Sequence, residues 1–248
     1  MDKLNETWTY CVQKYGYDRC IALTCHGSQN YELDLPTSDF DAKLIIAPTW
    51  NEVIFNHQPL SQTINGPYGD INITDVRLFI GNNLKKQNFN FLECLFTKYQ
   101  YVNPLYKDLW DELLQHREEI AHYDPHAAVR TMMGQVENQW KRWDRFDNTK
   151  TLYHMARIWH AICAYTTEES FADTLVPTIK PWIMDVRLGN IDPEDMWNNF
   201  RLFHLDAQLF ADQFYDTDQP VNYKTGELMD ELQKQFIYRA LYELRCEE

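Results

Sequence analysis

The apolar residues of this chain follow two different patterns, one in each half. In the first half, short apolar runs of strand length lie between amphipathic segments, and they predict strands over residues 20–25, 42–47 and 69–73. From about Pro104 onward the apolar positions recur at helical spacing and strand-like runs are absent. The segments predicted to be helical are 3–16, 75–87, 105–120, 125–143, 150–166, a helix starting near Asp192, and 226–244.

These elements predict an α+β fold. Residues 1–115 form a small mixed β-sheet core flanked by helices, and residues 116–248 form an all-helical domain. Local signals mark helix starts: the hydroxyl of Thr74 is predicted to cap the helix that follows it, and Pro193 after Asp192 suits a first helical turn. No flexible linker separates the two parts.

Composition narrows the class of protein. The chain has 248 residues, of which 44% are hydrophobic and 24% charged, as in a folded globular protein. Without a run of eighteen apolar residues we expect no membrane partner, and the first residues lack an apolar signal region. The six cysteines form no CxxC pair, so we expect reduced thiols and a cytoplasmic location.

Charge is distributed unevenly. The formal net charge is −14, which argues against binding of long duplex DNA. Between Arg130 and Arg157, however, six basic residues face three acidic ones, so this window carries +3 and the remainder −17. Such a window is commonly a solvated helix face, but it also suits a small anionic substrate.

Two short segments carry the candidate chemistry. Asp39 and Asp41 lie two residues apart at the entry to a predicted strand, so both side chains project from one face. Two carboxylates this close repel each other unless a cation lies between them, and Mg²⁺ prefers oxygen ligands and bridges to phosphates. Gly27 and Ser28 end the preceding strand, where backbone amides and a hydroxyl can approach a phosphate.

This combination resembles the DNA polymerase β-type nucleotidyltransferase superfamily, whose signature is a Gly-Ser pair, about ten residues, and then Asp-x-Asp. Here ten residues separate Ser28 from Asp39. Further matches resemble a bacterial and phage branch of predicted nucleotidyltransferases and extend over residues 20–195. They are Tyr31, Pro36-Thr-Ser-Asp39, Asn90-Phe-Leu-Glu93-Cys-Leu-Phe96, and Lys150 with His154 and Arg157.

The resemblance implies a third carboxylate on a neighbouring strand. We assign it to Asp70, at the start of the strand 69–73, with Asp75 as the alternative. Asp75 falls in the first turn of a predicted helix, where an acidic residue is ordinary helix-dipole complementarity. Asp39, Asp41 and Asp70 are therefore expected to hold two Mg²⁺ (or Mn²⁺) ions and to serve catalysis, Asp70 assisting deprotonation of the acceptor.

Lys150, His154 and Arg157 fall at i, i+4 and i+7, so one helix face presents all three. A basic face of this kind is commonly solvated, and His154 alone is equally a packed histidine. With the upstream motif, we expect the helical domain to complete the nucleotide cleft. A nucleoside triphosphate then binds between Gly27 and Ser28 on one side and these three residues on the other.

The function implied is transfer of a nucleoside monophosphate from an NTP to a hydroxyl, independent of a template, with release of pyrophosphate. The acceptor stays open among a small molecule, a protein hydroxyl and an RNA end. The main alternative is a nucleotide-binding sensor, or a defence, counter-defence or toxin–antitoxin module, without turnover. A third hypothesis is a purely structural helical protein, in which the spacing of the Gly-Ser and Asp-x-Asp motifs would be a coincidence.

One departure stands out. Many members of the branch have a small residue before the aromatic residue and glycine after it (Ala-Tyr-Gly), whereas this chain has Asn30-Tyr31-Glu32. Glu32 is expected to place a negative charge near the phosphate site, so that the loop packs differently or admits a different substrate.

Overall fold

The computed structural model describes residues 2–143, 148–167 and 170–243. It confirms the α+β class, with a five-stranded mixed sheet and a helical C-terminal region. The strands, in the spatial order β3-β4-β2-β1-β5, are β1 (Cys20–Cys25), β2 (Ala42–Ile46), β3 (Ser61–Asn65), β4 (Asp70–Asp75) and β5 (Gln100–Val102).

The three predicted strands are confirmed as β1, β2 and β4, while β3 and β5 were not predicted. Side chains of β3 are largely exposed at a sheet edge, so the segment lacks an apolar run, and β5 has only three residues. β2 and β4 are parallel, and Ala42 pairs with Ile71. The residues that immediately precede these strands therefore enter the sheet side by side.

Helices cover both faces of the sheet. The first half contains α1 (Asp2–Tyr15), α2 (Trp50–Ile54), α3 (Val76–Leu78) with a π-helical continuation (Phe79–Leu84), α4 (Phe89–Leu92), 3₁₀ turns (Glu93–Leu95 and Pro104–Tyr106), α5 (Lys107–Gln115) and α6 (Arg117–Ala121). Alternation along the strands sends Leu44 into a cluster with Trp8 of α1, and Ile45 into the large core shared with the other helices.

Two local predictions were wrong. Thr74 does not cap a helix, because β4 pairs with β2 as far as Asp75, and Thr74 lies buried within the strand. Asp75 is the cap instead, and its carboxylate accepts a hydrogen bond from the backbone N–H of Arg77 at 2.8 Å. The single helix predicted over 105–120 is interrupted at His116, which separates α5 from α6.

The second half is helical, as predicted. It contains α7 (Pro125–Arg142), α8 (Asn148–Thr166), α9 (Phe171–Leu175), α10 (Lys180–Arg187), α11 (Pro193–Tyr215), α12 (Tyr223–Tyr238) and a π-helical turn (Arg239–Glu243). Asp192 caps α11 by accepting from the N–H of Glu194 at 2.9 Å, as its sequence signal indicates. The last helix begins three residues earlier than predicted, and the predicted end at Leu244 lies outside the described residues.

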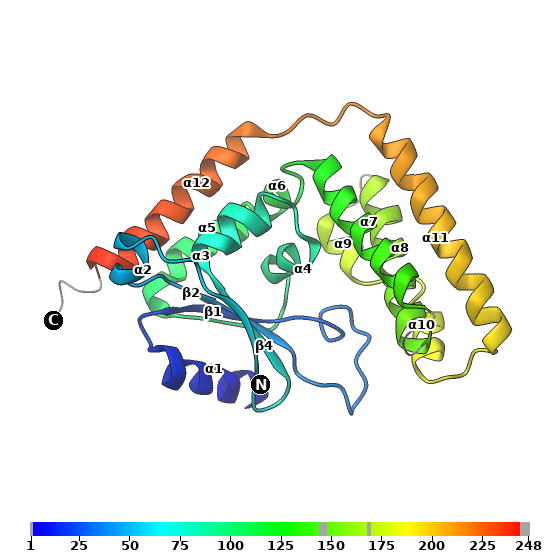
Figure 1. Cartoon of the computed structure of the whole chain (residues 1–248), viewed down its shortest axis with the longest axis horizontal. Helices are drawn as coiled ribbons and strands as arrows, with labels where there is room; N and C mark the ends of the chain where they lie inside the picture. Colours follow the sequence, from blue (N-terminus) through cyan, green and yellow to red (C-terminus); the bar gives the residue numbers. More distant parts are fainter. Residues whose placement is uncertain (1, 144–147, 168–169, 244–248) are drawn as a thin grey trace.

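The chain crosses from one side of the molecule to the other and returns. α7, α8 and α11 lie together, away from the sheet, whereas α12 runs back along α5 (Figure 1). Phe236 of α12 is fully buried in the same apolar core that contains Ile45 of the sheet and Leu152 of α8. The division at residues 115 and 116 stays a prediction.

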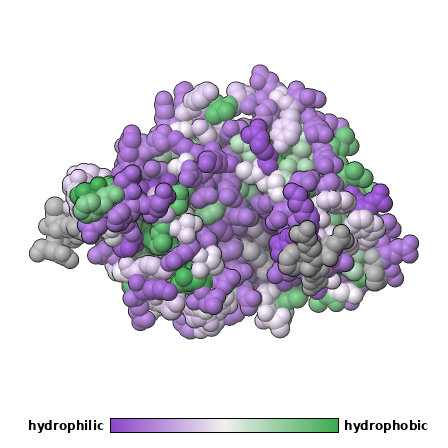
Figure 2. Space-filling model, in the orientation of Figure 1, coloured by the Kyte–Doolittle hydropathy of each residue, from purple (hydrophilic) through white to green (hydrophobic). Residues whose placement is uncertain are grey.

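The surface is mainly polar on the face drawn in Figure 2. Among the helices within residues 2–143, 148–167 and 170–243, none combines the length and the apolar character that crossing a membrane needs.

Candidate functional site

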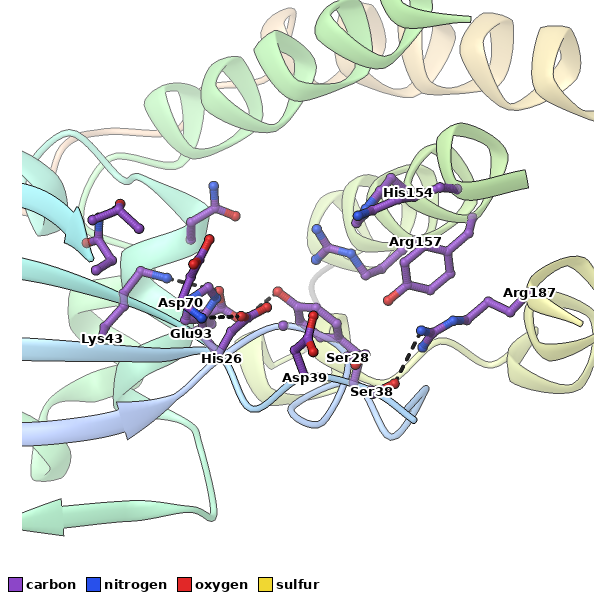
Figure 3. Close-up of a pocket in the computed structure, with 18 of the residues that line it drawn as sticks. His26, Ser28, Ser38, Asp39, Lys43, Asp70, Glu93, His154, Arg157 and Arg187 are labelled. Carbon is purple, nitrogen blue, oxygen red and sulfur yellow. Dashed lines mark hydrogen bonds and ion pairs between the residues drawn. The ribbon is translucent and has the colours of Figure 1, made fainter. Parts of the chain in front are cut away.

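A cavity of about 680 Å³ lies between the sheet and the helical half (Figure 3). All of the residues proposed from the sequence as site residues line it: Gly27, Ser28, Asp39, Asp41, Asp70, Lys150, His154 and Arg157. The fold thus brings together two groups that are more than 70 residues apart in the chain. Their roles stay predictions, whereas their convergence is a property of the structure.

The turn after β1 forms the first part of the sheet-side wall. Gly27 has φ +83°, a left-handed conformation that glycine adopts without the steric cost borne by other residues. The preceding residue, His26, donates its backbone N–H to the carbonyl of Asp41 at 3.1 Å. The Gly-Ser turn is therefore held directly beside the Asp-x-Asp segment.

Asp41 and Asp70 meet at the entry to the parallel strands β2 and β4, and Asp39 lines the same cavity. Asp41 accepts a hydrogen bond from the backbone N–H of Asp70 at 3.2 Å. A Cβ atom at Gly69 would lie 2.7 Å from the carbonyl oxygen of Phe40, so only glycine lets the two segments approach this closely. Burial raises the pKa of Asp41, and the negative charges of Asp39 and Asp70 raise it further.

This mutual repulsion is the condition that a bound cation relieves. In the part of the chain that the structure describes, no three histidine, cysteine or acidic side chains form a cluster that could hold a metal ion. Magnesium seldom uses an all-protein cage, and it binds through one or two carboxylates, water and substrate phosphates. Asp39, Asp41 and Asp70 are the carboxylates of this wall that could hold a divalent cation in that way.

Asp75 occupies a different environment from Asp70. It is fully buried and does not line the cavity. Its carboxylate pairs with Arg77, whose Nη2 lies 2.7 Å and Nε 3.0 Å from the two oxygens. Asp75 is thus engaged in a cap and an ion pair, while the exposed Asp70 faces the cavity, which supports the assignment of Asp70.

The opposite wall comes from α8. Arg157 is only 5% exposed, and its guanidinium lies 4.1 Å from the ring centroid of Tyr31 and 5.6 Å from that of Phe89. Its Nε and Nη1 are buried without a hydrogen-bond partner among the described residues. Leaving a buried charged donor unpaired costs about 1–3 kcal/mol or more, so an anion in the cavity would stabilise this side chain.

His154 is a neutral group in this wall. Burial, together with the positive charges of Arg157, Lys150, Arg142 and Arg187, lowers its pKa to about 3. At neutral pH it therefore contributes a hydrogen-bond donor and an acceptor, but no charge. The positive charge of Lys150 offsets part of the rise in the pKa of Asp41.

Sequence reasoning missed Arg187, which comes from α10 and also lines the cavity. It donates to the carbonyl of Leu33 and, at 3.4 Å, to the hydroxyl of Ser38, and its guanidinium lies 5.0 Å from the ring of Tyr153. These contacts tie the loop between Ser28 and Asp39 to the helical half. An isolated arginine in the last turn of a helix carries no signal that would have identified it.

A buried polar cluster in the lining of the cavity was also not predicted. Glu93 accepts from the hydroxyl of Tyr31 at 2.6 Å and lies 3.8 Å from Nζ of Lys43. Both Glu93 and Tyr31 fall in motif matches, but those matches gave no indication that the two residues touch. Their contact depends on the fold of the loop around Tyr31.

Glu32 does not act as the sequence suggested. It lies outside the lining of the cavity and pairs with Lys98 and Lys180 at 3.1 Å each. Hydrogen bonds to Lys180 and Lys98 lower the pKa of its carboxyl. Its charge is therefore compensated by two lysines and lies outside the lining of the cavity.

Comparison of the chain with protein-family models gives no match, and comparison with curated proteins gives none either. What the cleft does is therefore inferred from its own residues.

Proposed function

We propose that this protein is a metal-dependent nucleotidyltransferase that transfers a nucleoside monophosphate from an NTP to a hydroxyl. The observation that carries the proposal is the composition of one cavity. Its sheet-side wall holds three carboxylates beside a Gly-Ser turn, and its helical wall holds a buried arginine with open donors. Acidic residues that suit a divalent cation thus face basic residues that suit phosphates.

In the proposed reaction, the acceptor hydroxyl oxygen bonds to the α-phosphorus, and the bond from that phosphorus to the pyrophosphate oxygen breaks. The hydroxyl proton passes to Asp70 or to solvent, and pyrophosphate leaves. Bound Mg²⁺ or Mn²⁺ would stabilise the entering and leaving oxygens. Asp39, Asp41 and Asp70 would hold the metal.

The remaining residues position the triphosphate. The backbone amides and hydroxyl at Gly27 and Ser28 donate to phosphate oxygens. Arg157 binds phosphate oxygens with its unpaired donors, Lys150 adds a point charge, and neutral His154 adds a hydrogen bond. Such preorganised donors stabilise charge that develops on the phosphates.

The net charge of −14 disfavours long duplexes as acceptors, which leaves a small molecule, a protein hydroxyl or an RNA end. A nucleoside triphosphate substrate suits a cytoplasmic protein. The described cysteines Cys11, Cys20, Cys25, Cys94 and Cys163 are free thiols, which agrees with that location.

The proposal is tested by incubating the protein with each α-labelled NTP, Mg²⁺ or Mn²⁺, and cell fractions containing RNA, protein or metabolites. Pyrophosphate release and label in one fraction are expected. The Asp39→Ala/Asp41→Ala double variant should fold, as its melting curve would verify, but should lose metal-dependent NTP binding and turnover. Unchanged binding by this variant contradicts the site. NTP affinity without pyrophosphate release from any fraction favours the sensor alternative.

A further inference from the structure

Four buried polar side chains connect the two walls of the cavity in a continuous row. Lys43, Glu93, Tyr31 and Arg157 are 4%, 1%, 3% and 5% exposed. They come from β2, from the 3₁₀ turn after α4, from the loop between Gly27 and Asp39, and from α8. Figure 3 shows Lys43 and Glu93 on the strand side of the view and Arg157 on the helical side.

Each neighbouring pair in this row is in contact. Lys43 Nζ lies 3.8 Å from Glu93 Oε1, and Glu93 Oε2 accepts from the Tyr31 hydroxyl at 2.6 Å. The other end of the row is a ring contact, with the guanidinium of Arg157 4.1 Å from the Tyr31 centroid. Asn30 adds a hydrogen bond to Glu93 at 3.4 Å. The hydroxyl and the face of one tyrosine ring thus serve two different partners.

The positive charge of Arg157 is not offset within this row. Glu93 lies beside Lys43 and offsets its charge, and it reaches Arg157 only through the tyrosine. The ring contact uses a face of the guanidinium and leaves its N–H groups free to donate. Nε and Nη1 of Arg157 have no partner within the described ranges. A buried cation held by an aromatic ring, with open donors at a cavity, is a preformed site for an anion.

We propose that Lys43, Glu93 and Tyr31 form a positioning network that holds Arg157 as a ligand for the phosphate chain of the nucleotide. This inference rests on the proposed function, since it names the residues that prepare one part of the same site. Lys43 follows Asp41 by two residues on one strand face. The network therefore joins the metal-binding wall to the phosphate-binding wall through the loop that carries Tyr31.

A positioning network and a merely structural cluster predict different effects on ligand affinity. If the network positions Arg157, its loss weakens binding of the phosphate chain and leaves recognition of the base unchanged. Inorganic tripolyphosphate and the NTP should then lose affinity by the same factor. If the cluster only fills space, its loss lowers the melting temperature and leaves both affinities unchanged.

The decisive variant is Tyr31→Phe, which keeps the ring over Arg157 but removes the hydroxyl that anchors the ring to Glu93. We expect binding of NTP and of tripolyphosphate, measured by calorimetry with Mg²⁺, to weaken about tenfold. Tyr31→Leu, which also removes the ring contact, should weaken both further. Where turnover is measurable, KM for the NTP should rise more than kcat falls.

Tyr165→Phe is the matched control. Its hydroxyl is also buried and donates to a backbone carbonyl, that of Ala121 at 3.0 Å, but Tyr165 lies outside the cavity. It should lower the melting temperature as Tyr31→Phe does and leave both affinities unchanged. Equal affinities in wild type and Tyr31→Phe overturn the inference, and so does a wild type that binds neither NTP nor tripolyphosphate.

Failure of the proposed function gives a different result. The wild type could bind tripolyphosphate and NTP, with the expected loss of affinity in Tyr31→Phe, and yet release no pyrophosphate. That result would support the positioning network and contradict only the transferase activity. Tyr31→Phe should then resemble Arg157→Ala in the sign of its effect on tripolyphosphate, with a smaller loss.

Discussion

Glu32 has a backbone conformation that is uncommon for a residue with a side chain. Its φ is +54°, in the left-handed region where glycine is favoured. Ion pairs with Lys98 and Lys180 accompany that conformation. The Glu32 side chain therefore links the loop to α10.

A pH effect is expected at His154. Its pKa of about 3 in the folded chain lies well below the ordinary value of 6.5. At pH values between 3 and 6.5, His154 binds a proton in the unfolded chain but not in the folded chain. The free energy of unfolding therefore falls as the pH drops below about 6.5. Arg157, Lys150, Arg142 and Arg187 surround the imidazole and oppose its protonation.

Urea unfolding of wild type and His154→Gln at pH 7 and pH 5.5 measures this effect. From pH 7 to pH 5.5, the free energy of unfolding of the wild type should fall by on the order of 1 kcal/mol more than that of the variant. Parallel profiles would contradict a neutral His154 in the folded protein.

At the scale of elements, the entry to β2 and β4 determines which acidic residues face the cavity. The parallel pairing of Ala42 with Ile71 places Asp41 next to Asp70. The same pairing continues to Ile46 and Asp75, where the strand ends and the carboxylate caps α3. One strand thus begins at the proposed catalytic edge and ends at a structural ion pair.

Asp70 and Asp75 should therefore respond differently to substitution. Asp75→Ala removes a cap and leaves Arg77 unpaired, so we expect a loss of about 2–4 kcal/mol in unfolding free energy. Asp75→Asn keeps a cap acceptor and should lose less. Asp70→Asn should retain wild-type stability and lose metal-dependent transfer. Denaturation and pyrophosphate assays on the three variants check this, and an active Asp70→Asn with a folded but inactive Asp75→Asn would reverse the assignment.

At the scale of the whole molecule, the C-terminal helix joins the two halves. α12 packs against the first half, where Lys85 pairs with Asp230 at 2.6 Å and the ring of Phe236 lies 6.1 Å from that of Tyr106. The core that contains Phe236 also contains buried residues of α7, α8 and α11. A cleft lined by both halves therefore rests on one continuous apolar core.

Phe236→Ala tests whether that core unfolds as a unit. The ring is fully buried, so its loss should cost about 3–5 kcal/mol. Far-UV circular dichroism and tryptophan fluorescence should report one coincident transition at lower temperature. Lys234→Ala, on the same helix but exposed, should change stability by less than about 0.5 kcal/mol. Two separated transitions would instead indicate independent domains near the division at residues 115 and 116.

Apolar periodicity was enough to predict much of the fold. It located β1, β2 and β4 and the long helices α7 and α8, because a buried strand or helix face needs a regular run of apolar residues, while the start of α11 was predicted from Pro193 after Asp192. It did not locate β3, whose exposed residues need no such run, and it placed the α3 cap at Thr74. Strand pairing, which is a long-range interaction, moved that cap to Asp75.

Residue type and spacing were sufficient to predict the candidate residues of each wall of the cleft. They indicated Asp39 with Asp41, the Gly27-Ser28 turn, and the basic face of α8, all of which line the cavity. Only the tertiary structure brought these walls together, added Arg187, and stacked Tyr31 on Arg157. Local spacing determines which side chains share a face, whereas contacts between distant segments follow from how the apolar core packs.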